Sequence, residues 1–243
     1  MATSRTDPVD EPSGPGGRVL LIGASRGLGL ALARQWAGEG REVVATVRGP
    51  GWTALHDLAD ADPEHVEIET LDITVPAQIV ALRDRLAGRL FDLLFVNAGV
   101  TNQPEGTVAE TSVEEFTRVM VTNALSPLRV IEALQDLVDP AGTIGVMSSG
   151  QGSVANNERG GHEVYRGSKA ALNTFMRSYA ARHRDDRRTL VLMAPGWVRT
   201  DLGGADARLS IEESIPRVAS TLDALRGSRG LHYVDYLGRT VPW

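Results

Sequence analysis

Short apolar runs alternate with longer amphipathic stretches from residue 18 to the end of the chain. The short runs are rich in β-branched residues or leucine, a composition typical of strands. The sequence predicts about seven such strands, at Arg18–Ile22, Glu42–Val47, Val66–Thr70, Asp92–Val96, Thr143–Met147, Thr189–Met193 and Leu231–Tyr236.

Apolar residues in the intervening stretches recur at helical spacing. Helices are predicted at Leu28–Ala37, Val75–Leu86, Val113–Leu137, Glu163–Arg182 and Ile211–Leu225. Because strands and helices alternate, we expect βαβ units and a single-domain, Rossmann-type, doubly wound parallel sheet flanked by helices. The predicted domain covers residues 18–243.

Composition narrows the range of functions. The chain has 243 residues, 42% of them hydrophobic, which suits one large core. The net charge of -6 disfavours nucleic-acid binding, which requires a basic surface. The absence of cysteine excludes disulfides and thiolate nucleophiles, and no metal site is expected. A small-molecule partner is therefore the favoured interpretation.

The first 17 residues are rich in Pro, Gly, Ser, Thr and Asp and contain no apolar run. This composition predicts a disordered tail rather than a signal peptide. No stretch elsewhere approaches the roughly 18 to 20 apolar residues of a membrane helix. We expect a cytoplasmic protein that does not bind membranes.

A glycine-rich turn follows the first predicted strand, with Gly23, Ser25, Arg26, Gly27, Leu28 and Gly29 in sequence before a helix. Glycine adopts positive φ and lets backbone N–H groups and a helix N-terminus approach a pyrophosphate. The spacing is a variant of the dinucleotide-binding fingerprint. An ordinary glycine-rich strand-to-helix connection is the alternative.

The end of the second strand indicates which dinucleotide is bound. An acidic residue there binds the ribose 2′-OH of NAD, whereas a cation accommodates the 2′-phosphate of NADP. Here Arg48 follows the strand, and Arg26 lies in the glycine turn. NADP(H) is therefore the expected cofactor, with a solvated surface arginine as the alternative for each. Further cofactor contacts are expected at strand ends, from Asp72, Ile73, Asn97, Ala98 and Gly99.

Tyr165 and Lys169 are four residues apart on a predicted helix and so share one face. A ketone reduction needs a proton donor, and a nearby ammonium lowers the pKa of a tyrosine. Lys169 is the only lysine among 25 basic residues, and it could also hold the nicotinamide ribose. Ser149 is expected to polarise the substrate oxygen, and Asn123 to hold a water that links Lys169 to solvent.

A tyrosine and a lysine at this spacing are more often surface neighbours. The specificity comes from their order, after the glycine turn, the Asn97-Ala98-Gly99 segment and a serine at a strand end. In this order the residues resemble the short-chain dehydrogenase/reductase family from Arg18 onward. The resemblance implies a catalytic tetrad of Asn123, Ser149, Tyr165 and Lys169, with Tyr165 and Lys169 also binding the cofactor.

The segments Tyr165–Asn173, Pro195–Asp201 and Val241–Trp243 resemble the carbonyl-reductase subgroup that includes C-factor-like proteins. This resemblance implies transfer of the 4-pro-S hydride and cofactor contacts from the Pro195 segment, namely Pro195, Gly196, Val198 and Thr200. One departure concerns Ser149, which precedes Tyr165 by more residues than the family's usual serine. Ser148 and Ser153 therefore compete with it.

The substrate cleft is expected to be closed by residues 100–107, by residues 151–157 and by a lid after Thr200, with Val100, Gln151, Asn156 and Trp197 as substrate contacts. The expected substrate is a small carbonyl or alcohol. Alternatives are alcohol dehydrogenation, epimerisation or dehydration on the same scaffold, and a cofactor-binding signalling protein. The family resemblance also implies a homodimer.

Overall fold

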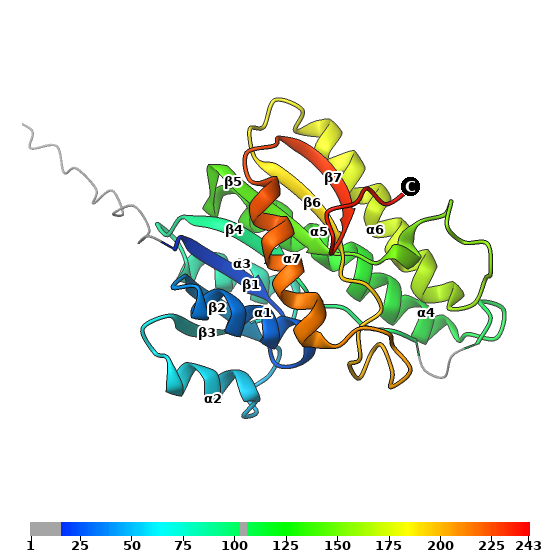
Figure 1. Ribbon diagram of the computed structural model, residues 1–243, viewed down its shortest axis with the longest axis horizontal. Coiled ribbons are helices and arrows are strands. Elements are labelled where there is room, and N and C mark those ends of the chain that lie inside the picture. The colour runs from blue at the N-terminus through cyan, green and yellow to red at the C-terminus, as the bar shows by residue number, and fades with distance from the viewer. Residues whose placement is uncertain (1–15, 103–105) are drawn as a thin grey trace, which may run out of the picture.

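The computed structural model describes residues 16–102 and 106–243. Within these ranges, seven parallel strands form one sheet in the order β3-β2-β1-β4-β5-β6-β7 (Figure 1). The strands are β1 (Arg18–Ile22), β2 (Glu42–Val47), β3 (Val66–Thr70), β4 (Phe91–Val96), β5 (Val138–Met147), β6 (Thr189–Ala194) and β7 (Gly230–Asp235). The order reverses between β1 and β4, which creates the crevice where such sheets bind ligands. The predicted fold class is confirmed.

Both faces of the sheet are covered by helices, which explains why β1, β4 and β6 are almost entirely buried. The helices are α1 (Gly27–Gly38), α2 (Ala54–Ala61), α3 (Pro76–Arg85), α4 (Val113–Met120), α5 (Ser126–Leu134), α6 (Glu163–Arg182) and α7 (Ile211–Leu225). Helices α1, α2 and α7 contribute to the core on one face, and α3, α5 and α6 to the core on the other. Figure 1 shows α1 and α7 side by side in front of the sheet.

The structure corrects several predicted elements. Helix α2 was not predicted, and only Leu55 among its residues is buried. The helix predicted over Val113–Leu137 is divided, because a π-helix at Val121–Leu125 separates α4 from α5 and a 3₁₀ turn at Gln135–Leu137 follows. Strand β5 starts before the predicted Thr143, and β7 ends one residue before the predicted Tyr236.

The first fifteen residues of the predicted tail lie outside the described residues. Gly17 is described, and its carbonyl accepts a hydrogen bond from Glu42 N at 3.2 Å. The backbone is therefore hydrogen-bonded to β2 at Gly17, just before β1 begins. In the part of the chain that the structure describes, no helix is long and apolar enough to cross a membrane.

The carboxyl ends of the central strands bring the predicted site residues to one edge of the sheet. Backbone N–H groups of Asn97 and Ala98, just after β4, donate to Ile22 O at the end of β1, at 2.9 and 3.0 Å. Ser148 N, just after β5, donates to Met193 O of β6 at 2.8 Å. These bonds continue the strand pairing into the loops, so the loops start from fixed positions.

Candidate active site

Helix α6 presents Tyr165 and Lys169 one turn apart. The chain enters the helix through Gly160, Gly161 and His162, whose φ angles of 67°, 71° and 49° all lie in the left-handed region. Lys169 is 3% exposed, and its Nζ donates to Met147 O, at the end of β5, at 2.9 Å. Nζ also lies 5.8 Å from the centroid of the Tyr165 ring. The predicted pair therefore points from α6 toward the end of β5.

Ser149 lies beside Tyr165. Its Oγ accepts a hydrogen bond from Gln151 N at 3.1 Å, and its hydroxyl also hydrogen-bonds with the Tyr165 side chain. Because Gln151 N–H occupies an acceptor position of Oγ, the hydroxyl proton of Ser149 is available to Tyr165 or to a substrate oxygen.

The two competing serines have other partners. Ser148 Oγ donates to Asn173 Oδ1 at 2.6 Å, and Ser153 Oγ donates to the backbone oxygen of Trp243 at 3.5 Å. Both side chains are buried, with 2% and 1% exposure. This arrangement favours Ser149 for the predicted role.

Burial controls the ionisation of the pair. It raises the pKa of Tyr165 to about 12, and the hydrogen bond from Ser149 opposes this rise. Burial lowers the pKa of Lys169 to about 8. The pKa of Tyr165 is thus raised overall, not lowered as the sequence predicted, because burial is the largest influence on it. At neutral pH, Tyr165 is protonated and Lys169 is mostly charged, a state suited to proton donation by the tyrosine.

Asn123 lies in the π-helix and holds the backbone after β4. Its Oδ1 accepts from Val100 N at 2.8 Å, and its Nδ2 donates to Val100 O at 2.8 Å and to Ser168 Oγ at 2.9 Å. A Cβ on Gly99 would lie 3.4 Å from both Asn123 Oδ1 and Lys169 Nζ. Asn123 and Lys169 therefore flank Gly99, and the water relay through Asn123 stays a prediction.

The glycine turn has the geometry that its sequence predicts. Gly23 has a φ of 90°, and a Cβ there would lie 2.8 Å from Ala98 Cβ. A Cβ on Gly29 would lie only 2.0 Å from Gly23 O. Asn97 Nδ2 donates to Gly23 O at 2.7 Å, which ties the turn to β4. Larger residues at these glycines would displace the backbone.

Thr46 supports the turn and was not predicted. Its Oγ1 accepts from Gly23 N at 2.9 Å, and its backbone oxygen accepts from Ala24 N at 2.8 Å. The signal in the sequence was a hydroxyl residue near the end of a strand whose other residues after Glu42 are apolar.

The start of α1 suits a pyrophosphate. Within the described residues, its first turn carries no acidic side chain, and Arg26 at the N-cap makes no side-chain capping bond. By contrast, α7 begins with a capping box formed by Ser210 and Glu213. A helix start without such a cap offers unsatisfied N–H groups and a positive dipole end to an anion. The residues therefore fit a dinucleotide.

The two predicted phosphate-binding arginines differ in their surroundings. Arg48 is exposed directly after β2. Arg26 is also exposed but pairs with Asp201, a partner that sequence reasoning missed. Ser25 and Leu28, in the same turn as Arg26, are half-buried.

At the predicted adenine contact, Asp72 Oδ1 accepts from the Thr74 backbone N at 2.9 Å and from its hydroxyl at 2.7 Å, so it caps a turn. The Ile73 side chain belongs to the core with 5% exposure. Only the backbone of Ile73 is left for a ligand.

The segment after β6 lies next to the glycine turn, since a Cβ on Gly27 would lie 3.9 Å from Thr200 Cγ2. Pro195 O accepts from Ser214 Oγ of α7 at 2.7 Å. Gly196 has a φ of 87°, and a Cβ there would lie 2.5 Å from Leu209 Cδ1. The Val198 side chain is buried. The segment is therefore anchored where the resemblance expects nicotinamide contacts.

The four predicted substrate contacts are placed unequally. Val100 is half-buried and held through its backbone, whereas Asn156 is exposed. Trp197 is 50% exposed, and its Nε1 donates to Gly203 O at 2.7 Å. Gln151 Oε1 is buried and makes no hydrogen bond among the described residues. Residues 103–105 of the predicted cleft wall lie outside the described residues.

Comparison with known proteins agrees with this geometry. Residues 23–219 match a family profile described as Enoyl-(Acyl carrier protein) reductase. A solved short-chain dehydrogenase/reductase from Burkholderia multivorans with bound NADP is 60% identical, with a TM-score of 0.93 over 94% of this chain and 100% of that one.

Two further relatives share the resemblance. A carbonyl reductase from Pseudomonas aeruginosa PAO1 in complex with NADP is 36% identical, with a TM-score of 0.87 over 93% of this chain and 99% of that one. The C-signal protein of Myxococcus xanthus is 36% identical over 63% of this chain and 92% of its own length. The chain belongs to the short-chain dehydrogenase/reductase family of oxidoreductases.

Proposed function

We propose that this protein is an NADPH-dependent carbonyl reductase that reduces a ketone or aldehyde of a small organic substrate to an alcohol. The observation that carries the proposal is the pair of hydrogen-bonded hydroxyls on Ser149 and Tyr165, with the amine of Lys169 buried beside the tyrosine. Two hydroxyl donors that converge on one point are what a carbonyl oxygen needs as it becomes an alkoxide.

Each side chain has a defined task. Ser149 donates to the substrate oxygen, which polarises the carbonyl bond, while Gln151 N–H fixes the serine oxygen. Tyr165, whose pKa burial raises to about 12, keeps its proton until negative charge develops on that oxygen and then transfers it. Lys169 stabilises the resulting phenolate electrostatically. NADPH, when bound, supplies the hydride.

The hydroxyl of Tyr165 is the group to remove first. Tyr165→Phe should lower carbonyl reduction by about 100-fold or more, the usual contribution of a general acid, while NADPH binding is retained. Loss of NADPH absorbance against a panel of ketones and aldehydes measures turnover, and NADPH fluorescence measures binding. Tyr179→Phe, which alters a tyrosine bonded to Gln135 elsewhere in the fold, is the matched control. Unchanged turnover in Tyr165→Phe would refute the mechanism.

Arg48 supports the choice of NADPH because it is exposed at the end of β2, where the 2′-phosphate is expected. The B. multivorans and P. aeruginosa relatives were crystallised with NADP. Arg48→Asp should weaken NADPH binding and leave NADH binding little changed, as titration of each cofactor would show. Equal affinity of the unaltered protein for NADH and NADPH contradicts this cofactor choice.

The same assays separate the alternatives. Oxidation of alcohols with NADP⁺, without reduction of any carbonyl, would favour a dehydrogenase. NADPH binding without turnover, together with a partner protein that binds only the NADPH-loaded form, would favour signalling. The similarity to the C-signal protein keeps that second hypothesis relevant.

We also propose a homodimer formed through α4, α5 and α6. Large apolar side chains lie exposed on these elements, with Phe116 on α4, Leu125 at the end of the π-helix and Phe175 on α6 all at least 39% exposed. Light scattering should give twice the 26.1 kDa mass of the chain. Phe175→Asp should shift the mass toward the monomer.

A further inference from the structure

A buried tyrosine from the far edge of the sheet holds the backbone of Ser149. Tyr233, in β7, is 2% exposed, and its hydroxyl donates to Ser149 O at 2.5 Å. Gly152 N donates to the same carbonyl at 2.9 Å. The Ser149 peptide is therefore fixed from both sides, although 84 residues of sequence separate it from Tyr233.

The tyrosine is part of a buried polar group behind the site. Its hydroxyl also interacts with Ser148 and Asn173, whose side chains are hydrogen-bonded to each other at 2.6 Å. Asn173 Nδ2 donates to Gly152 O at 3.2 Å. Asn173 lies one turn after Lys169 on α6. This polar group therefore connects α6 to residues 149–162, the serine loop, which joins Ser149 to the start of that helix.

Trp243 holds the next part of the same loop. Its ring packs against Tyr233 with centroids 5.4 Å apart, and the Arg177 guanidinium lies 4.7 Å from its centroid. Its backbone oxygen accepts from Ala155 N at 2.9 Å and from Ser153 Oγ at 3.5 Å. The residues after β7 thus brace the loop that connects Ser149 with α6.

We infer that Tyr233 is a positioning residue for Ser149 and that Trp243 secures Tyr233 and the loop. Rotation of the Ser149 peptide would move the Ser149 side-chain hydroxyl away from Tyr165 and from the carbonyl oxygen of the substrate. Two buried donors on the Ser149 carbonyl oppose that rotation. Tyr233 donates its hydroxyl to the Ser149 carbonyl and not to Tyr165, and its direct effect on Tyr165 is a coulombic one that raises the pKa of that group. Its positioning effect therefore passes through Ser149. The inference rests on the proposed reduction for its kinetic effect but not for its structural one.

The test removes one hydroxyl. Tyr233→Phe keeps the ring that packs against Trp243 and leaves the Ser149 carbonyl with one donor. We expect kcat to fall by about 10-fold, because small displacements of catalytic groups are costly, while Kd for NADPH is unchanged. In the Ser149→Ala background, Tyr233→Phe should cause no further loss, since the group that it positions is gone.

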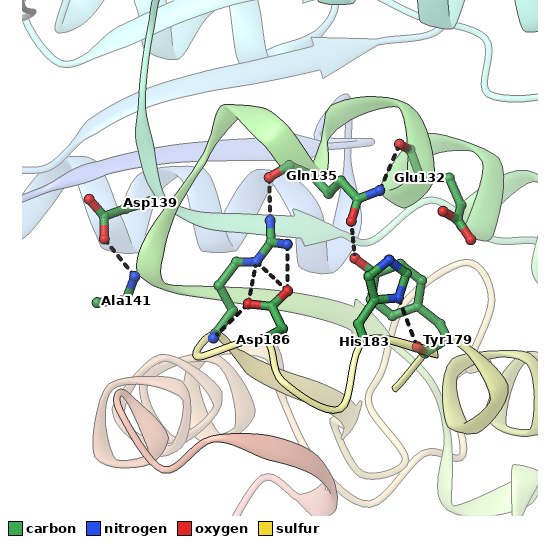
Figure 2. Close-up of polar contacts among 8 residues, drawn as sticks. Glu132, Gln135, Asp139, Ala141, Tyr179, His183 and Asp186 are labelled. Carbon is green, nitrogen blue, oxygen red and sulfur yellow. Dashed lines mark hydrogen bonds and ion pairs between the residues drawn. The ribbon is translucent and has the colours of Figure 1, made fainter. Parts of the chain in front are cut away.

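Tyr179→Phe is the matched control. Tyr179 is also fully buried and donates its hydroxyl to a carbonyl-type oxygen, Gln135 Oε1, at 2.6 Å. Figure 2 shows this bond in a cluster with Glu132, His183 and Asp186, none of which belongs to the proposed site. Loss of stability alone would affect both variants, whereas loss of positioning would affect only Tyr233→Phe.

Hydrogen exchange provides a readout that does not depend on turnover. In Tyr233→Phe, the amides of Gly152 and Ala155 should exchange faster, whereas Tyr179→Phe should leave them unchanged. Trp243→Ala should accelerate Ala155 in the same way. If the unaltered protein reduces no carbonyl, the proposed function fails and exchange alone decides the positioning role. The inference would be overturned if the Gly152 and Ala155 amides exchanged as slowly in Tyr233→Phe as in the unaltered protein. It would also be overturned if Tyr233→Phe lowered kcat by the same factor in the Ser149→Ala background as in the unaltered protein.

Discussion

Lys169 illustrates how a single residue can serve the site at the expense of stability. Burial lowers its pKa to about 8, so the charged form is less stable in the folded protein than in the unfolded chain. Below pH 8, both states hold the proton and the cost is constant. Above pH 8, the unfolded chain, with an ordinary lysine pKa near 10.5, binds more protons, so stability from this residue rises with pH.

Lys169→Met should therefore have a higher free energy of unfolding than the unaltered protein, and the difference should be largest near pH 7. Its advantage should shrink by about 2 kcal/mol between pH 8 and pH 10. The opposing loss from Tyr165, whose pKa is raised to about 12, begins only near pH 10. Urea unfolding of both proteins across this range measures the difference. An advantage that is constant with pH would show that Lys169 does not titrate there.

While the Arg26 guanidinium pairs with Asp201, fewer of its N–H groups can bind a phosphate. Both side chains are about three-quarters exposed, at 74% and 78%, so the pair is weak and easily exchanged. Asp201→Asn should free the guanidinium and tighten NADPH binding by about 5-fold or less at low salt. Fluorescence titration of NADPH and NADH provides the test. An equal gain for NADH would mean that Arg26 does not recognise the 2′-phosphate.

At the scale of elements, the short 3₁₀ turn Gly150–Gly152 determines how closely the serine loop approaches α6. A Cβ on Gly152 would lie 2.8 Å from Asn173 Nδ2 and 3.0 Å from Lys169 Cβ. Gly152→Ala should cost about 1 to 3 kcal/mol of stability and lower turnover, because it pushes the loop from the helix. Gly150→Ala, with no atom within 4 Å of its Cβ, is the control. Thermal unfolding that is equal in both would contradict this packing.

Helices with a long, regular apolar pattern were predicted more accurately than elements that bury few apolar side chains. Helices α6 and α7 have their predicted bounds, since long amphipathic stretches carry their own signal. Helix α2 buries mainly Leu55 and so gave little periodicity. The π-helix around Asn123 has no periodic signature, and it occurs where that side chain bonds Val100 and Ser168.

The site shows the same division. Tyr165, Lys169 and the glycine turn were predictable because local spacing places them on one helix face or one turn. Tyr233, Thr46 and Asp201 were not, because each acts on a residue that is remote in sequence and is brought close only by strand order or loop packing. Serine assignment likewise needed the partners of Ser148 and Ser153.

At the scale of the whole molecule, the proposed cofactor would join the two halves of the sheet. The glycine turn follows β1, whereas Lys169 and Thr200 belong to segments on the β5–β7 side. A ligand that binds only the folded chain stabilises it by about 2.7 kcal/mol at 100 times its Kd. NADPH at that excess should raise Tm by roughly 5 to 10 °C, measured by calorimetry. No shift would show that the cofactor does not bind this site.

The solitary lysine has a practical consequence for covalent labelling. Every other cationic side chain that carries a fixed charge is an arginine, so the chain has one ε-amine, and it lies buried between α6 and β5. Reagents that acylate amines spread over the surface of most proteins. Here their only side-chain target is the group that the proposed reaction requires, and its pKa of about 8 makes a large fraction nucleophilic in mild base. Conjugation or immobilisation through Lys169 would therefore inactivate the protein. Protection of the Lys169 amine from acylation by bound NADPH would report cofactor occupancy directly.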